Sequence, residues 1–256
     1  MWITGASSGI GEALVRPLVA RGARVAISAR RGDVLGSQAL GWQQQGADVR
    51  AFPLDVTDKD ATRLAVQQVI EAFGRIDIAV LNAGNHVTPK VRPFDAQQYV
   101  DNMTLNFFGM LYGIEAVLPG MLARGRGHIA GISSLAGLRP LPTAGAYGAS
   151  KSAASHMLDA IRFDLEPRGI LVTNVTPGFV RTPLTDRNKY RMPFLMEVDR
   201  AAEILADGLE RRKREIHFPK PLSWTIKTLR VLPYPLYSWI IQKATGDRQR
   251  LAKSDS

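Results

Sequence analysis

Short apolar segments that alternate with longer helical segments restrict the fold of this chain more than any other feature. Runs rich in Val and Ile predict buried strands near residues 24–28, 48–53, 76–82, 127–132 and 171–176. Helical periodicity lies between them, near residues 9–20, 34–45, 59–73, 95–119 and 146–166. This order predicts a single α/β domain built on a doubly wound parallel sheet. Ligands of such sheets bind beyond the carboxyl ends of the strands, so chemistry is expected at the strand-to-helix turns.

A glycine-rich turn, Thr4-Gly5-Ala6-Ser7-Ser8-Gly9-Ile10-Gly11, opens the first predicted helix. Only residues 1–3 precede it, so either the chain starts further upstream or the sheet tolerates a very short first strand. Glycines allow positive φ and a close backbone approach, and free N–H groups at a helix start bind phosphate. An ordinary tight turn could use the same residues, but the position at the start of a β-α series favours a pyrophosphate site.

The composition excludes several classes of function. With 256 residues, of which 45% are apolar, the chain can bury one large core. It contains no Cys, which excludes disulfides and thiolate nucleophiles and fits a reducing compartment. Its four His are far apart in the sequence, so no metal site is expected. We see neither a signal peptide nor an uncharged apolar run long enough to span a membrane, and we expect a cytoplasmic protein.

The order of the motifs resembles the short-chain dehydrogenase/reductase family. The glycine spacing Gly-x-x-x-Gly-x-Gly is followed by Asn82-Ala83-Gly84 after the fourth strand, Tyr147-x-x-x-Lys151, and Pro177-Gly178 after the sixth strand. The resemblance covers roughly residues 1–212. It implies a Rossmann-like fold and hydride transfer between a nicotinamide dinucleotide and a carbonyl/alcohol pair.

Tyr147 and Lys151 are the candidates for proton transfer. They are four residues apart and therefore share one helical face, and no other Tyr of the chain has Lys at this spacing. A free phenol has a pKa of about 10, so a nearby ammonium is needed to stabilise the phenolate near neutrality. The resemblance adds Ser134, which would orient the substrate oxygen, and Asn106, which would bind a water of the proton relay. Ser133 remains an alternative to Ser134, and Asn106 alone would be an ordinary polar residue of a helix.

The resemblance also implies a set of residues that contact the dinucleotide. Asp55 would contact the adenine, although capping of the next helix is an equal alternative for it. Thr182 would contact the nicotinamide carboxamide. The complete set is Gly5, Ser7, Ser8, Gly9, Ile10, Gly11, Arg30, Asp55, Val56, Asn82, Ala83, Gly84, Tyr147, Lys151, Pro177, Gly178 and Thr182.

The end of the second strand favours NADP over NAD. Enzymes that use NAD usually carry a carboxylate there, which accepts a hydrogen bond from the ribose 2′-OH. By family register Ala29 takes that place and Arg30 follows it, and a guanidinium suits a 2′-phosphate. A solvated basic loop would have the same composition, and Asp33 nearby is a carboxylate that could favour NAD.

By resemblance, the substrate pocket comes from residues 85–93, 135–143 and 181–196. The third loop is rich in apolar residues, which predicts a small apolar carbonyl or alcohol as substrate, although such residues also pack lid helices. The apolar residues are Leu184, Tyr190, Met192, Pro193, Phe194, Leu195 and Met196.

The last part of the chain departs from the family pattern. A seventh strand is expected at residues 215–218, which closes a catalytic domain of residues 1–218 and leaves a basic, aromatic-rich tail of residues 219–256. Residues 211–256 contain eleven Lys and Arg against three Asp and Glu. Since no nucleic-acid-binding motif accompanies this charge, no nucleic acid is expected as a partner. Tail helices docked on the domain or on a second subunit are slightly favoured over peripheral contact with a membrane surface.

Two classes of function remain open. The favoured one is an NADP-dependent oxidoreductase, which could form a homo-oligomer, although its tail differs from that of the family's tetramers. The alternative is a non-catalytic, nucleotide-sensing binding protein on the same fold. Such proteins generally lose the Tyr or the Lys, and this chain has both.

Overall fold

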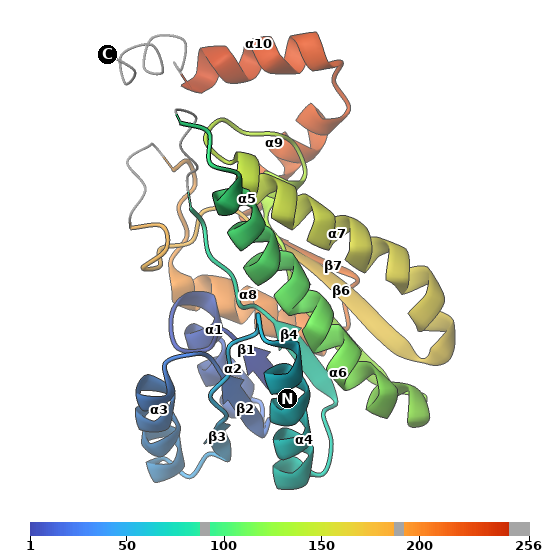
Figure 1. Ribbon diagram of the computed structural model, residues 1–256. Coiled ribbons are helices and arrows are strands. Elements are labelled where there is room, and N and C mark those ends of the chain that lie inside the picture. Colours follow the sequence, from blue (N-terminus) through green and yellow to red (C-terminus); the bar gives the residue numbers. More distant parts are fainter. Residues whose placement is uncertain (88–92, 187–191, 246–256) are drawn as a thin grey trace.

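The computed structural model describes residues 1–87, 93–186 and 192–245. Within these residues, seven parallel strands form one sheet in the order β3-β2-β1-β4-β5-β6-β7, with helices on both of its faces (Figure 1). The strands are β1 (Trp2–Thr4), β2 (Val25–Ser28), β3 (Val49–Ala51), β4 (Ile78–Leu81), β5 (Gly127–Ile132), β6 (Ile170–Pro177) and β7 (Glu215–Phe218). The predicted doubly wound parallel sheet is therefore confirmed.

The short first strand lies in the middle of the sheet. Trp2 of β1 is in register with Ala26 of β2 on one side and with Ala79 of β4 on the other. Its indole is fully buried, and Nε1 donates a hydrogen bond to Ser28 Oγ at 2.9 Å. Three residues are thus enough for β1 to join both neighbours and to bring the glycine-rich turn to the carboxyl edge.

Helices cover the two faces of the sheet as separate layers, each with its own apolar core. Trp2 packs into one core and Ile3 into the other, because successive residues of a strand point to opposite faces. One layer contains α1 (Gly9–Ala13), α2 (Val15–Ala20), α3 (Gly32–Gln44) and α8 (Val198–Glu210). The other contains α4 (Lys59–Phe73), α5 (Ala96–Met103), α6 (Gly109–Ala123) and α7 (Gly145–Leu165).

Three helical segments differ from the prediction. The first predicted helix is divided at Leu14 into α1 and α2. Between α5 and α6, residues Thr104–Phe108 form a π-helical turn, and α6 continues past Pro119, where the predicted helix ended. Helix α8 was not predicted, although its buried residues, among them Leu205 and Leu209, recur at helical spacing.

One helical run among the described residues, 96–123, is long and apolar enough to cross a membrane by length and composition alone. The expectation concerned uncharged runs, and this one contains Asp101 and Glu115. The run contacts α4 and α7, and Glu115 pairs with Lys59 at 2.9 Å. In this structure it serves as a covering helix of the sheet.

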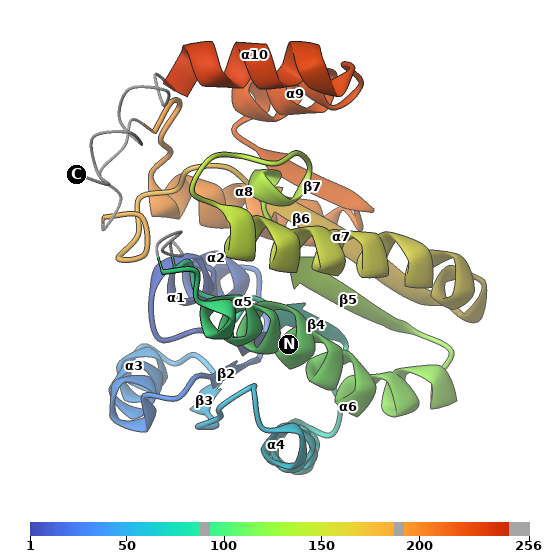
Figure 2. The ribbon, with the colours of Figure 1, turned by 45° about the horizontal axis from the view of Figure 1, so that its top comes forward.

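Residues 220–245 form two helices, α9 (Lys220–Arg230) and α10 (Tyr234–Thr245), at one end of the molecule (Figure 2). Leu222 and Ile226 of α9 pack with Leu135, which follows β5. Beyond α9, the carbonyl of Leu232 accepts a hydrogen bond from Arg139 at 2.8 Å. These contacts attach the described part of the tail to the loop between β5 and α7.

Candidate active site

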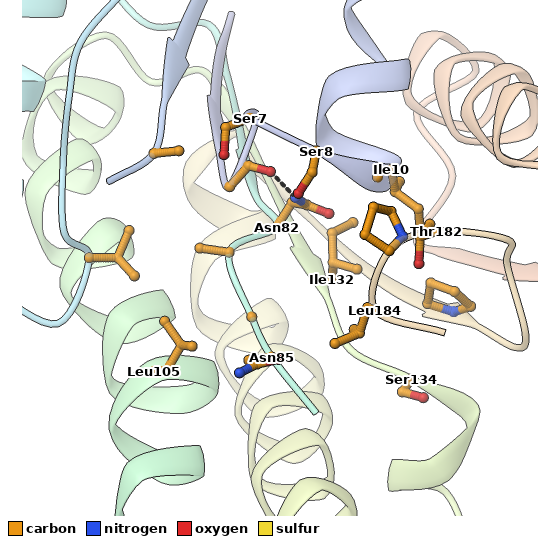
Figure 3. Close-up of a pocket in the computed structure, with 18 of the residues that line it drawn as sticks. Ser7, Ser8, Ile10, Asn82, Asn85, Leu105, Ile132, Ser134, Thr182 and Leu184 are labelled. Carbon is orange, nitrogen blue, oxygen red and sulfur yellow. Dashed lines mark hydrogen bonds between the residues drawn. The ribbon is translucent and has the colours of Figure 1, made fainter. Parts of the chain in front are cut away.

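A cavity of about 520 Å³ lies at the carboxyl ends of the strands (Figure 3). The turn after β1 and the segments after β2, β3, β4, β5 and β6 form its walls. All predicted site residues line this cavity except Gly11 and Asn106. In the predicted substrate loops, Leu184 lines it, whereas residues 135–143 and 192–196 do not, and residues 88–92 and 187–191 lie outside the described residues.

The glycines of the first turn permit close packing as well as an unusual backbone. Gly5 and Gly9 have φ values of +67° and +61°, which L side chains rarely adopt. A Cβ on Gly5 would lie 2.7 Å from the Cα of Ala83, and one on Gly11 would lie 2.5 Å from the carbonyl oxygen of Gly5. Gly11 therefore lets α1 approach the turn rather than forming part of the cavity wall.

Asn82 joins this turn to the end of β4. Its Nδ2 donates to the carbonyl oxygens of Thr4 and Gly5 at 3.0 and 3.1 Å. In return, the hydroxyl of Thr4 accepts hydrogen bonds from the backbone N–H groups of Asn82 and Ala83. Figure 3 shows Asn82 below Ser8, on the cavity side of the turn. The Asn-Ala-Gly segment thus holds the turn in place.

Two arginines follow β2 at the cavity wall, although the sequence analysis singled out only Arg30. Arg31 donates from one guanidinium nitrogen to the carbonyl oxygen and to the hydroxyl of Ser7, both at 2.9 Å. The pair Arg30-Arg31 in the sequence was the available signal for this second residue. Asp33, the carboxylate that could have favoured NAD, is not among the lining residues.

Asp55 lines the cavity after β3 and does not cap a helix. Its Oδ1 accepts hydrogen bonds from the N–H and the hydroxyl of Thr57, at 3.0 and 2.8 Å. The helix α4 is capped by Asp58, which accepts from the N–H of Ala61. The alternative role for Asp55 is therefore wrong, because its neighbour three residues later performs it.

Lys151 is a buried base next to Tyr147. Both residues are on α7, and the Lys151 Nζ lies 5.9 Å from the centroid of the Tyr147 ring. The ammonium donates to the carbonyl oxygen of Ile132 at 2.8 Å. Burial lowers the pKa of Lys151 from 10.5 to about 8, because the low-dielectric interior disfavours the charged form. At pH 7 the group still carries its proton.

The two serines after β5 have different hydrogen bonds. Ser133 donates to the carbonyl oxygen of Lys151 at 2.8 Å and accepts from the hydroxyl of Ser155 at 2.7 Å. The Ser134 hydroxyl accepts from the N–H of Ala136 at 3.1 Å and, among the described residues, has no acceptor for its own proton. Ser133 therefore anchors α7, whereas Ser134 can still donate to a ligand.

Asn106 lies behind the cavity wall, within the π-helical turn. Its Oδ1 accepts from the N–H of Asn85 at 2.8 Å, and its Nδ2 donates to the Asn85 carbonyl and to Ser150. A Cβ on Gly84 would come within 3.0 Å of this Oδ1 and 3.2 Å of the Lys151 Nζ. The side chain thus fixes the segment after β4, and π-helical turns often occur at such functional positions.

His86, which lies in the predicted substrate loop of residues 85–93 but was not singled out there, is a neighbour of the candidate catalytic group. Its ring packs on that of Tyr147 with a centroid distance of 4.8 Å. Its Nε2 is buried and has no hydrogen-bond partner in the part of the chain that the structure describes. Burial lowers the pKa of this imidazole below its usual 6.5, so it is neutral at pH 7. The only signal was its place two residues after the Asn-Ala-Gly motif.

Comparisons with known proteins place the chain in a family. Residues 1–192 match the family model described as short chain dehydrogenase. An uncharacterized oxidoreductase of Myxococcus xanthus is 40% identical over 92% of this chain and 93% of its own length. A short-chain dehydrogenase from Sphingobium yanoikuyae, solved with NADPH, is 28% identical and superimposes with a TM-score of 0.79 over 89% of this chain and 91% of its own.

A second solved structure shows the fold alone. It is a short chain dehydrogenase/reductase from Burkholderia phymatum in complex with NAD, 22% identical, with a TM-score of 0.81 over 88% of this chain and 91% of its own. The matched family model covers three quarters of the sequence, and the oxidoreductase relative covers nearly all of it. This chain belongs to the short chain dehydrogenase family and is an NAD(P)-dependent oxidoreductase.

Proposed function

We propose that this oxidoreductase prefers NADP and transfers a hydride between the nicotinamide and a carbonyl or secondary alcohol of an apolar substrate. The supporting observation is one continuous cavity with the glycine-rich turn in one wall and Ser134, Tyr147 and Lys151 in another. A phosphate-binding turn and a proton donor within one cavity are what hydride transfer to a carbonyl requires.

The residues around the cavity fit a phosphorylated dinucleotide. Gly5 and Gly9 of the turn line the cavity with φ values of +67° and +61°, and they carry no side chain that would keep a ligand from the backbone. Arg30 and Arg31 at the end of β2 can bind a 2′-phosphate through charge-assisted hydrogen bonds. Asp55 and Val56, Pro177 and Gly178, and Thr182 complete the wall. When bound, the dinucleotide supplies or accepts the hydride.

The chain's own residues would handle the proton. Tyr147 donates its phenolic proton to the carbonyl oxygen during reduction, and the Lys151 ammonium stabilises the phenolate that results. Ser134 holds the carbonyl oxygen through the hydroxyl proton that no described residue accepts. Asn106 positions this group of residues by fixing Asn85 against α7.

An apolar substrate is supported by apolar side chains in the cavity wall. Leu105, Ile132, Val180 and Leu184 line the same cavity as Ser134 and Tyr147. We propose an apolar carbonyl compound as the substrate and a cytoplasmic enzyme that contacts a membrane surface. A homo-oligomer is compatible with this proposal.

The test is a screen of NADPH and NADH oxidation over aldehydes and ketones of increasing chain length. We expect turnover with NADPH to exceed that with NADH, and kcat/KM to rise with chain length. Tyr112→Phe, a change outside the cavity, serves as the control for loss of a phenol. If the protein binds NADPH but oxidises it with none of these compounds, the nucleotide-sensing alternative replaces the proposal.

A further inference from the structure

Helices α9 and α10 each bury one face and expose the other. On α9, Leu222 and Ile226 are buried against the loop after β5, whereas Trp224 is 60% exposed. On α10, Tyr237 is buried and Trp239 is 59% exposed. We define the tail surface as the exposed residues Trp224, Val231, Tyr234, Leu236 and Trp239 together with the basic residues Lys220, Lys227, Arg230 and Lys243.

The charges of the tail surface all have one sign. Residues 219–245 contain four basic residues and no Asp or Glu. Two of the cations lie on the exposed indoles, with Lys227 Nζ 5.6 Å from the Trp224 ring and Lys243 Nζ 5.2 Å from the Trp239 ring. Lys227 is also paired with Glu215 of β7 at 2.6 Å, so it contributes less free charge than the others.

This combination of side chains fits an anionic lipid surface. Indole and phenol rings favour the level of the lipid headgroups, where the ring meets hydrocarbon and the polar atom meets water. Lys and Arg beside them bind the anionic headgroups, and amphipathic helices lie in the plane of such an interface. A protein partner that covers exposed Trp side chains would not by itself require an unbroken series of positive charges.

The faces of α9 and α10 opposite the tail surface contact the loop that begins at Ser134. Arg139 of this loop donates to Leu232, its guanidinium lies 4.3 Å from the Tyr237 ring, and the Tyr237 hydroxyl donates to the carbonyl of Pro140. A Cβ on Gly178, in the cavity wall, would lie 2.8 Å from Leu222 of α9. A lipid surface that bound the exposed faces of α9 and α10 would therefore be separated from the loop after β5 by these two helices.

We propose that the tail surface docks the enzyme on an anionic lipid surface, and that the enzyme takes its apolar substrate from that lipid. The docking stands on the two helices alone. The second part rests on the proposed function, since it requires an apolar substrate.

Docking is tested by sedimentation of the full-length protein with phosphatidylcholine vesicles, with and without about 30% phosphatidylglycerol, at about 0.05 M and about 0.5 M salt. We expect binding to the anionic vesicles at low salt only. Trp224→Ala with Trp239→Ala, and separately Arg230→Glu with Lys243→Glu, should each weaken this binding at least about tenfold. Circular dichroism and dinucleotide binding verify that each variant is folded.

Matched controls lie elsewhere on the molecule. Phe163→Ala removes an 82% exposed aromatic ring from α7, and Arg126→Glu reverses an exposed charge before β5. Both should bind vesicles as the wild type does. Docking is refuted if the wild type ignores anionic vesicles, if the controls lose binding equally, or if the tryptophan variant binds normally. It is also refuted if that variant changes only the oligomeric state, because the surface would then cover a second copy.

The source of the substrate is tested by a long-chain aldehyde dissolved in anionic or in neutral vesicles. Anionic vesicles should raise kcat/KM at least about fivefold for the wild type but not for the Arg230→Glu, Lys243→Glu variant. Equal rates in both vesicles would refute delivery from lipid. If vesicle binding holds while no carbonyl compound is turned over in any medium, the proposed function fails and the docking stands.

Discussion

Lys151 is the position at which catalysis and stability are expected to conflict most strongly. Its side chain is 3% exposed, and its Nζ donates to one backbone carbonyl, that of Ile132. Burial lowers the pKa of Lys151 from 10.5 to about 8. The folded protein therefore carries a buried ammonium at neutral pH, which is what the candidate chemistry needs and what the core disfavours.

The change Lys151→Met removes the charge and keeps a side chain of similar length. Between pH 8 and 10.5 the unfolded wild-type chain still holds the proton that the folded chain has lost, so stability rises with pH in this window. Over the whole interval the free energy of unfolding rises by about 3 kcal/mol, and between pH 7 and 9.5 it rises by about 2 kcal/mol. Methionine does not titrate, so the variant lacks this gain.

The assay is urea unfolding of the cofactor-free wild type and the Met variant at pH 7 and at pH 9.5. The free energy of unfolding of the wild type, relative to the variant, should increase by about 2 kcal/mol between the two pH values. At pH 7 the variant should be at least as stable as the wild type, yet inactive. Lys213→Met, at an exposed position, is the control for the loss of a lysine.

If the free energies of unfolding of the wild type and the Met variant change equally with pH, this expectation is refuted, because Lys151 then titrates as an exposed lysine does. The same pKa predicts the pH dependence of activity. Reduction of a carbonyl compound should slow as the pH rises through about 8, since deprotonation removes the charge that stabilises the phenolate.

Three further predictions concern the cavity wall. Tyr147→Phe should lower kcat about 100-fold or more and leave NADPH binding intact in a fluorescence titration, and retention of a tenth of kcat would contradict its role. Arg30→Ala should weaken the binding of NADPH relative to that of NADH by about 1.5–3 kcal/mol. Arg31→Ala should weaken the binding of both cofactors, because Arg31 holds Ser7 of the turn. Equal losses of affinity for both cofactors in the Arg30 variant would exclude Arg30 from 2′-phosphate binding. Ser134→Ala should reduce kcat. Ser133→Ala should lower the free energy of unfolding by about 1–3 kcal/mol and keep the activity per folded molecule. The opposite pattern would reverse the two roles.

Elements with local signals were predicted closely from the sequence. The strands at residues 127–132 and 215–218 and the helix at residues 59–73 have the predicted bounds. Asp58 caps that helix and Gly74 ends it with a positive φ, so both of its ends are encoded in adjacent residues. The π-helical turn at Thr104–Phe108 has no such local signal. It contains Asn106, whose side chain is held by Asn85 from a different element.

In the candidate site, too, features with a local sequence signal were predicted and contacts between distant residues were not. Tyr147 and Lys151 were found because a spacing of four residues on a helix fixes their common face. The contact of Arg31 with Ser7 joins positions 24 residues apart, and the contact of His86 with Tyr147 joins two different elements. Such contacts depend on the order of strands in the sheet, which a single sequence does not state residue by residue.

The tail shows why composition alone left two interpretations open. Composition counts aromatic and basic residues but does not divide them between the faces of a helix. Tyr237 and Trp239 are two positions apart, which turns them by about 200° on α10, so one is buried against the domain while the other is exposed. Docking on the protein and contact with lipid can therefore belong to opposite faces of the same helices. Deleting residues 220–256 would remove both faces and uncover Leu135, so only substitutions confined to the exposed face separate the two roles.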